Sequence, residues 1–230
     1  MATKNIIVTG TSRGIGFELV KYLGEHDHHI LALTRNGEKI DLFQKTHKSI
    51  TVLELDITVE KDLKVVTDFV QKKWDRVDVM IHNAGMLIHK PFNKTTIDDF
   101  LNVYKVNVFA VAELTKRMIP FLHHGSHVVA ISSMGGIQGS MKFAGLSAYS
   151  SSKGAVITLM ELLAEEYKDS GIAFNTLALG AVQTEMLAQA FPDFKAPVTA
   201  AEMAQYIANF SLTGNKMYNG KILQVSNSTP

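Results

Sequence analysis

A tyrosine and a lysine stand four positions apart in the segment YSSSK, residues 149–153. The apolar pattern of residues 149–167 predicts a helix, and positions i and i+4 of a helix share one face. The phenol of Tyr149 and the ammonium of Lys153 should therefore point into the same space. A phenol with its ordinary pKa of about 10 is a poor acid–base group at neutral pH, but a nearby cation favours the phenolate. The pair is a candidate general acid–base group, although the same spacing also occurs in surface pairs.

A glycine-rich turn, TGTSRGIG, follows the first apolar run at residues 9–16. Gly10 can form the tight turn that leaves a strand, Gly14 lets backbone approach a pyrophosphate, and Gly16 lets the next helix pack close to the sheet. The free N–H groups and the dipole of that helix attract phosphate. Glycines are common in loops, so the turn gains its weight from lying between a strand and a helix. We expect a dinucleotide to bind there.

The second apolar run ends in LTRN, residues 33–36, without an acidic residue. An acid at this place would bind the ribose 2′-hydroxyl of NAD, whereas an arginine accommodates the 2′-phosphate of NADP. Arg35 and Arg13 could hold one phosphate between them, since guanidinium geometry suits phosphate. The alternative is that both are solvated loop charges. The expected cofactor is NADP(H), with NAD(H) as the less favoured choice.

Short apolar runs alternate with helical patterns along the whole chain. The predicted strands are residues 5–9, 29–34, 50–55, 77–81, 127–131, 172–177 and 221–225. The predicted helices are residues 16–24, 60–74, 98–122, 149–167 and 200–211. Such alternation predicts an α/β fold of Rossmann type: a doubly wound, parallel, seven-stranded sheet with helices on both faces. No linker-like segment interrupts the pattern, so residues 1–230 are expected to form one domain.

Composition excludes several classes of protein. The chain has 230 residues, of which 46% are hydrophobic and 20% charged, which is typical of globular proteins. Because it has no cysteine, disulfides, thiolate metal sites and cysteine nucleophiles are excluded. The 23 basic and 22 acidic residues nearly balance, which argues against nucleic acid and anionic membranes as partners. Neither a signal peptide nor a membrane-spanning run is visible, so we expect a cytoplasmic protein.

Several motifs together resemble the short-chain dehydrogenase/reductases, and the resemblance covers essentially the whole chain. The motifs are the TSRGIG turn, Asn83-Ala84-Gly85 after the fourth strand, Asn107, Ser133 and YSSSK. The resemblance implies that Tyr149 is the general acid that protonates the substrate oxygen during reduction. Lys153 would lower the tyrosine pKa and hold the ribose of the nicotinamide. Ser133, with Ser132 as the fallback, would bond the substrate carbonyl, and Asn107 would hold a water.

The resemblance also implies a cofactor site that runs along the carboxyl ends of the strands. Asp56 would contact the adenine, residues 83–85 would follow the adenosine, and Gly180 and Val182 would face the nicotinamide. The full expected set is Gly10, Ser12, Arg13, Gly14, Ile15, Gly16, Arg35, Asp56, Ile57, Asn83, Ala84, Gly85, Tyr149, Lys153, Gly180, Val182 and Thr184.

This sequence departs from the family pattern in three places. His82 replaces an asparagine, Leu179 replaces a proline, and residues 134–147 include extra positions before Tyr149. Leu179 frees a backbone angle that proline would fix, so the contact with the nicotinamide amide could be looser. None of the departures removes a catalytic group.

Nine histidines raise the possibility of a metal site. Two clusters, His26/His28/His29 and His123/His124/His127, fall before predicted strands, whereas ligands of parallel sheets bind at the carboxyl edge. No acidic or cysteine ligands accompany them at zinc spacing. We therefore expect solvated loop histidines and no metal.

Three segments should wall the substrate pocket: residues 86–88, residues 134–146, and a substrate loop within residues 183–198. Their apolar side chains are Met86, Leu87, Ile137, Met141, Phe143, Met186, Leu187, Phe191 and Phe194. Such a lining favours an uncharged, largely apolar carbonyl compound or secondary alcohol, although the same residues could simply pack the loop onto the body. An NADPH-dependent oxidoreductase is the leading hypothesis. The alternatives are a 3-oxoacyl-[acyl-carrier-protein] reductase and a non-catalytic NADP(H)-binding sensor.

The helix predicted for residues 98–122 is apolar almost all round, and so is the helix that starts at Tyr149. A helix of that kind must be covered on more than its sheet side. A symmetric partner would cover the remainder, so a homodimer or homotetramer is expected. The alternative is that loops and neighbouring helices cover it within a monomer.

Overall fold

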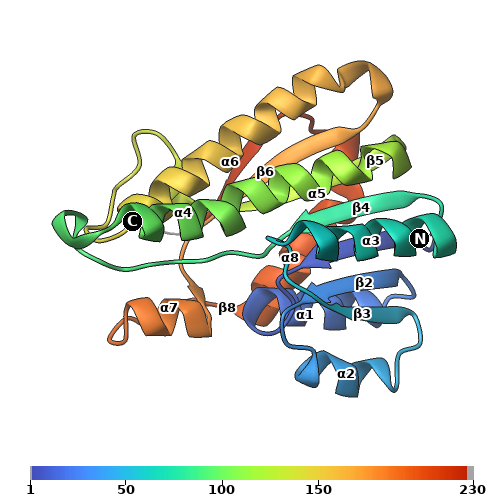
Figure 1. Cartoon of the computed structure of the whole chain (residues 1–230), viewed down its shortest axis with the longest axis horizontal. Coiled ribbons are helices and arrows are strands. Elements are labelled where there is room, and N and C mark those ends of the chain that lie inside the picture. Colours follow the sequence, from blue (N-terminus) through green and yellow to red (C-terminus); the bar gives the residue numbers. More distant parts are fainter. Residues whose placement is uncertain (1, 227–230) are drawn as a thin grey trace.

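Parallel strands form the central sheet in the order β3-β2-β1-β4-β5-β6-β9 (Figure 1). The structure, a computed structural model, describes residues 2–226, and within that range this sheet has seven strands. Their bounds are β1 Asn5–Thr9, β2 His29–Thr34, β3 Ile50–Glu54, β4 Val77–His82, β5 Leu122–Ser133, β6 Ala173–Leu179 and β9 Ile222–Val225. The single-domain, doubly wound parallel sheet predicted from the sequence is confirmed.

Helices cover both faces of the sheet, because the inner strands are apolar on both sides. Ile6, Ile7 and Val8 of β1 are all fully buried; the side chains of Ile6 and Val8 join one core, and that of Ile7 joins the other. The first core packs against α1 Gly14–Gly24, α2 Glu38–Gln44 and α8 Ala200–Thr213. The second packs against α3 Glu60–Lys73, α5 Ala110–Met118 and α6 Ser147–Glu166. Figure 1 shows α3, α5 and α6 running side by side.

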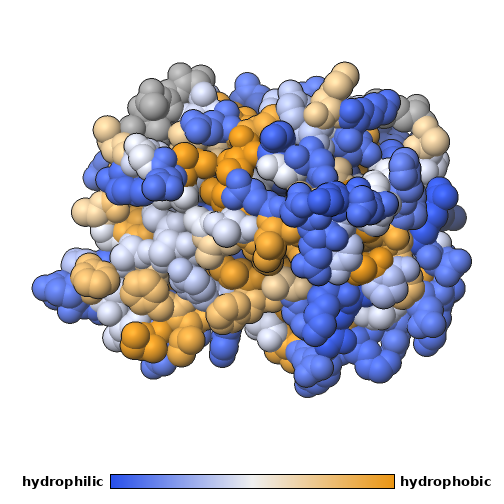
Figure 2. All heavy atoms as spheres, turned by 90° about the horizontal axis from the view of Figure 1, so that it is seen from above, coloured by the Kyte–Doolittle hydropathy of each residue, from blue (hydrophilic) through white to orange (hydrophobic). Residues whose placement is uncertain are grey.

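The strand order changes direction at β1, which pairs with β2 on one side and with β4 on the other. The loops that leave β1 and β4 diverge to opposite faces at this point, and ligands of doubly wound sheets bind in the resulting crevice. The glycine turn follows β1 and residues 83–85 follow β4, so the topology brings them together. In the face seen in Figure 2, hydrophobic atoms are more frequent on the left half, towards which the carboxyl ends point, than on the right half.

The helix predicted for residues 98–122 is divided by a turn of π-helix. It begins as α4 Ile97–Tyr104 with a capping box between Thr96 and Asp99, passes through the π turn Lys105–Phe109, and continues as α5. A short 3₁₀ turn, Ile119–Phe121, ends it, and Leu122 already belongs to β5. The predicted end at residue 122 was therefore wrong, because Pro120 tightens the last turn before the chain extends.

Other boundaries and elements also differ from the sequence prediction. Strand β5 is longer than the predicted residues 127–131, and α6 begins two residues before Tyr149. Helix α2 and the short helix α7 Glu185–Ala190 were not predicted. A small second sheet pairs β7 Val182–Gln183 with β8 Val198–Thr199 and closes the base of the 183–198 segment. Within residues 2–226, no helix combines the length and apolarity that crossing a membrane requires.

Two of the clustered histidines are buried, which corrects the expectation that all of them are solvated. His28 accepts a hydrogen bond from the backbone N–H of Lys4, and His127 lies between the Ser211 carbonyl (2.9 Å) and the amide of Asn175 (2.9 Å). Burial lowers the pKa of His127 to about 4, so its ring is neutral at physiological pH. Among the described residues, no group of three or more histidines and acids is placed to hold a metal ion.

Candidate active site

A cavity of about 650 Å³ opens at the carboxyl edge of the sheet, above the point where the strand order changes. It contains nearly all of the site residues expected from the sequence, drawn from the loops after β1, β2, β3, β4, β5 and β6 and from the start of α6. Gly16 and Asn107 do not line it. Gly16 packs directly against Gly10 and Asn83 of the lining, and the buried Asn107 bonds the backbone of Met86.

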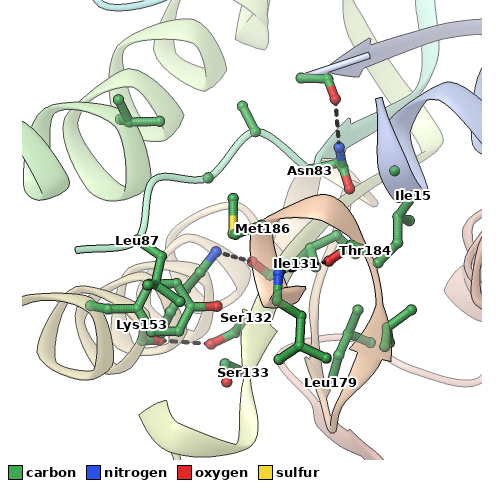
Figure 3. A pocket seen from close by; sticks show the side chains of 18 of the residues that line it. Ile15, Asn83, Leu87, Ile131, Ser132, Ser133, Lys153, Leu179, Thr184 and Met186 are labelled. Carbon is green, nitrogen blue, oxygen red and sulfur yellow. Dashed lines mark hydrogen bonds between the residues drawn. The ribbon is translucent and has the colours of Figure 1, made fainter. Parts of the chain in front are cut away.

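Tyr149, Lys153 and Ser133 converge on the middle of this cavity. The lysine Nζ lies 5.8 Å from the centre of the tyrosine ring and donates a hydrogen bond to the Ile131 carbonyl at 2.7 Å. Figure 3 shows the Lys153 amine directed at Ile131, with Ser132 and Ser133 at the end of β5 beside it. The i, i+4 spacing on α6 therefore places the two ionisable groups as the sequence predicted.

Ser132 and Ser133 have different hydrogen-bond partners. This difference distinguishes Ser133, which was expected to bond the substrate carbonyl, from Ser132, the fallback for that role. The buried hydroxyl of Ser132 donates to the Lys153 carbonyl at 2.8 Å and so fastens α6 to β5. Ser133 accepts a hydrogen bond from the N–H of Gly135 at 3.2 Å and bonds the Tyr149 phenol. Ser133 is thus the serine that stands with the tyrosine.

Burial dominates the electrostatics of the pair. It raises the pKa of Tyr149, and the hydrogen bond with Ser133 opposes that rise. Burial also lowers the pKa of Lys153 to about 8, because the low-dielectric surroundings disfavour the ammonium. In this structure burial holds the pKa of Tyr149 above its ordinary value, and the Lys153 ammonium bonds the Ile131 carbonyl, so the expected lowering of the tyrosine pKa by Lys153 is not seen.

Asn107 connects the π turn to residues 149–153 of α6. Its amide oxygen accepts from the N–H of Met86 at 2.8 Å, and its amide nitrogen donates to the Met86 carbonyl at 3.0 Å and to the Ser152 hydroxyl at 2.9 Å. Ser152 in turn donates to the Tyr149 carbonyl at 2.7 Å. Reasoning from the sequence missed Ser152, whose only signal was a small polar residue between Tyr149 and Lys153.

The glycine turn is packed so closely that side chains are excluded. At Gly16 a Cβ would lie 2.1 Å from the Gly10 carbonyl oxygen, and at Gly10, where φ is +71°, it would lie 2.5 Å from the Ala84 Cα. Asn83 holds this arrangement, since its amide donates to the carbonyls of Thr9 (3.1 Å) and Gly10 (3.0 Å). The Asn83 side chain therefore supports the turn, and Figure 3 draws one hydrogen bond from its amide as a dashed line.

Arg13 and Arg35 are both exposed and both line the cavity at the end that carries the glycine turn. Asp56 and Ile57 border the same end, although the Asp56 carboxylate already accepts two hydrogen bonds of 2.8 Å from Thr58. Helix α1 begins at Gly14, and no side chain caps its first N–H groups in the described part of the chain. Two guanidinium groups and a free helix N-terminus make this end suitable for anions.

The other end of the cavity is apolar. Its lining includes Leu87, Met141, Phe143, Leu146, Met186, Leu187, Phe191 and Phe194. Met86 and Ile137, which were expected there, are not part of the lining. The backbone N–H of Met86 donates a hydrogen bond to Asn107. The backbone carbonyl of Ile137 accepts a hydrogen bond from the Lys142 amine. Met186 and Leu87 flank the site in Figure 3.

Leu179 and Gly180 continue the sheet at the place where proline was expected. Leu179 pairs with Val225 of β9, and the Gly180 N–H donates to the Val225 carbonyl at 2.9 Å. A Cβ on Gly180 would lie 2.4 Å from the Ser226 hydroxyl oxygen. Val182 and Thr184 follow on the cavity wall, and the Thr184 hydroxyl caps α7 by accepting from the Leu187 N–H at 3.2 Å.

Comparison with known proteins finds several relatives. The model of the short chain dehydrogenase family matches residues 4–195. An oxidoreductase of Botryotinia fuckeliana is 30% identical over 187 residues, which cover 80% of this chain and 67% of that protein. The 7alpha-hydroxysteroid dehydrogenase of Escherichia coli is 28% identical, covering 97% of this chain and 92% of that one.

Solved structures are similar in fold. The protein ElxO with NADP bound superposes with a TM-score of 0.84 at 26% identity, covering 97% of both chains. A tyrosine-to-phenylalanine variant of the same protein was solved with NADPH bound and is 25% identical to this chain. Because the family model spans most of its length, the chain belongs to the short chain dehydrogenase family of oxidoreductases.

Proposed function

We propose that this protein is an NADPH-dependent oxidoreductase that transfers a hydride between the nicotinamide and a largely apolar ketone or secondary alcohol. The observation that carries the proposal is the convergence of Tyr149, Ser133 and Lys153 on one cavity that has the glycine turn and two arginines at one end and an apolar lining at the other. The nicotinamide would supply or accept the hydride at the centre of that cavity.

The residues present fit a dinucleotide. The cavity extends from Arg35 to the tyrosine, and Gly10 and Gly14 carry no side chain of their own between it and the start of α1. Thr184 and Glu185 lie across from this turn, and Glu185 Oε2 would be 3.5 Å from a Cβ at Gly14. At Gly14 φ is +56°, a backbone conformation that a residue with a Cβ would adopt only with strain. Arg13 and Arg35 supply charge for a 2′-phosphate, which supports NADP(H) over NAD(H). The NADP-bound relative ElxO supports the same choice.

Tyr149 would act as the general acid in reduction and the general base in oxidation. Because burial raises its pKa, the phenol keeps its proton at neutral pH and can donate it to a developing alkoxide. Ser133, bonded to the same phenol, would orient the substrate oxygen. Lys153 would exchange its bond to the Ile131 carbonyl for cofactor hydroxyls, and its lowered pKa lets it pass a proton on. Asn107 would hold this group in register through Ser152.

The apolar end indicates the class of substrate. The charged side chains that line the cavity are Arg13, Arg35, Asp56, Lys153 and Glu185, and the segments 134–146 and 183–198 otherwise contribute aromatic and aliphatic side chains. A bulky neutral ketone would bury apolar surface there without leaving a charge unpaired. By its name, the 7alpha-hydroxysteroid dehydrogenase among the relatives acts on a steroid that carries a hydroxyl group, which supports a bulky, largely apolar substrate here.

The test compares the wild type with Tyr149→Phe. Turnover is followed by NADPH absorbance with a panel of cyclic and steroid ketones, and with a 3-oxoacyl substrate on its carrier protein. Removing the proton donor should lower kcat at least about a hundredfold, while the NADPH dissociation constant changes little because the phenyl ring keeps its place. A variant that retains more than a tenth of wild-type activity would refute the role of Tyr149. If the wild type prefers the carrier-bound substrate, the 3-oxoacyl-[acyl-carrier-protein] reductase hypothesis replaces that of a free ketone.

We also propose that the protein assembles as a symmetric dimer or tetramer through the helices beside the sheet. Leu101 and Phe109 on the α4–α5 segment and Leu162 on α6 are exposed by 45%, 52% and 60%. A self-complementary partner would cover all three. Light scattering on the purified protein should give a mass of two or four chains. A mass near the 25.3 kDa of one chain at micromolar concentration would contradict assembly.

A further inference from the structure

His89 lies where three segments of the cavity rim meet. It follows β4 by a few residues, and its Nδ1 is 3.0 Å from the carbonyl oxygen of Ala190, the last residue of α7. Its Nε2 is 3.2 Å from the carbonyl oxygen of Ala144 in the 134–146 loop. Figure 1 shows α7 projecting from the body of the molecule. The histidine therefore joins the two segments that carry the apolar end of the cavity.

Both polar neighbours of the His89 ring are carbonyl oxygens, which only accept hydrogen bonds. A neutral imidazole has one N–H and one lone pair, so it can donate to one of the two carbonyls while its lone pair faces the other. An imidazolium donates from both nitrogens at once, and each of those bonds is charge-assisted. The Phe191 ring, whose centre is 4.9 Å from that of His89, would add a favourable contact with a cation.

The His89 ring packs directly against Gly145, where a side chain would clash with it. At Gly145, where φ is +84°, a Cβ would lie 2.4 Å from the Cδ2 atom of His89. The Gly145 carbonyl also accepts from the N–H of Lys90 at 2.9 Å, which brings the two backbones together beside the ring. The position of the ring therefore depends on the backbone at Gly145 and at Lys90.

Charged groups on the surrounding elements have other partners or face solvent. Lys90 pairs with Asp99 of α4 at 2.7 Å, and Lys142 donates to the Ile137 carbonyl. The 183–198 segment carries Glu185, Asp193 and Lys195, all exposed. Among residues 2–226, none of these groups forms an ion pair with His89, and its polar contacts are the two carbonyl oxygens.

We propose that His89 is a pH-sensitive clasp that closes the 183–198 segment over the substrate end of the cavity. The protonated ring ties α7 to the 134–146 loop through both carbonyls. Loss of the proton releases one of these bonds and lets α7 open. The closure stands on this geometry alone, whereas its effect on substrate retention rests on the proposed oxidoreductase function.

The test measures amide hydrogen exchange in peptides of the 183–198 segment at pH 5.5 and pH 8.0, with rates corrected for intrinsic exchange. One charge-assisted hydrogen bond should slow opening about tenfold at the lower pH. His89→Phe keeps a ring against Phe191 but no donor, so it should remove the pH dependence. His47→Phe is the matched control, because His47 also stacks on a phenylalanine and has its Nδ1 3.2 Å from a backbone carbonyl, outside the cavity lining.

A second pair of variants tests the contact between Gly145 and the His89 ring without changing the histidine. Gly145→Ala and Gly139→Ala share the strain of a positive φ, but a Cβ at Gly139 would meet open space. Only the Gly145 variant should lose the slowed exchange. Equal exchange in the wild type and His89→Phe at both pH values, or equal effects of the two glycine variants, would overturn the clasp.

Kinetics separate the clasp from the proposed function. With an apolar ketone such as 2-tetralone, His89→Phe should raise KM severalfold at pH 5.5 and little at pH 8.0, with a smaller effect on kcat. If exchange follows His89 but no ketone is turned over, the clasp stands and the oxidoreductase proposal fails. If turnover is normal but exchange ignores His89, the clasp alone is refuted.

Discussion

Replacing Lys153 by methionine should abolish turnover and yet stabilise the folded protein at pH 7. Burial lowers the pKa of Lys153 from its ordinary 10.5 to about 8, so the folded state holds the ammonium less readily than the unfolded chain does. Between pH 8 and pH 10.5 the unfolded state binds more protons, and stability therefore rises with pH across that window. Below pH 8 the buried ammonium lowers the free energy of unfolding by its full amount, roughly 3 kcal/mol at 1.36 kcal/mol per pKa unit.

Methionine has no charge to bury but leaves the Ile131 carbonyl without its donor, which costs about 1 kcal/mol. The net gain at pH 7 is about 2 kcal/mol. The wild type recovers about 2 kcal/mol between pH 7 and pH 9.5 as its lysine loses the proton, so the two proteins should then be equally stable. Groups other than Lys153 titrate in both proteins and cancel in the difference.

Urea unfolding at pH 7.0, 8.0, 8.75 and 9.5 measures this difference directly. Lys153→Arg is the control, because it keeps the buried charge but cannot lose its proton in this range, so it should gain no relief as the pH rises. A constant difference between wild type and Lys153→Met across the series, or a methionine variant that is less stable at pH 7, would refute the reasoning. A gain in stability on removing the Lys153 amine would reflect the cost of burying a charge.

Two further predictions concern other charges. Arg35→Ala should weaken NADPH binding roughly ten- to a hundredfold, the worth of about 1.5–3 kcal/mol for a charge-assisted bond, and leave NADH nearly unchanged; equal losses for both cofactors in titration calorimetry would show that Arg35 does not meet the 2′-phosphate. Burial lowers the pKa of His82 to about 4, so the unfolded state binds more protons below pH 6.5 and stability is lost as the pH falls towards 4. His82→Asn should remove about 2.5 kcal/mol of that acid-induced loss in urea unfolding at pH 7 and pH 4.5, and an unchanged pH dependence would contradict it.

The strands and the chemical groups could be predicted because their signals are local. Apolar runs such as residues 5–9 can only be buried on both faces, and the alternation with helices leaves a parallel sheet as the solution. The spacing of Tyr149 and Lys153 on one helix places both side chains in one cavity whatever lies around them. The glycine turn was predictable for the same reason, since its residues need particular backbone angles.

Only the tertiary structure decided how those groups are held. The division of labour between Ser132 and Ser133 depends on where α6 crosses β5, and the link from Asn107 through Ser152 depends on a π turn that carries no sequence signal of its own. The pKa values of Tyr149 and Lys153 follow from burial, which is a property of the assembled layers.

Contacts between segments distant in sequence were beyond prediction for the same physical reason. His89 meets Ala144 and Ala190 only because three loops converge at one edge of the sheet. A helix as short as α7 is not stable alone, even with good helix formers, and depends on its threonine cap and on the rest of the fold. Local sequence therefore determined which chemical groups this protein has and on which elements they lie. Long-range packing decided which of them touch, because the partners of a side chain are set by the fold of the whole chain.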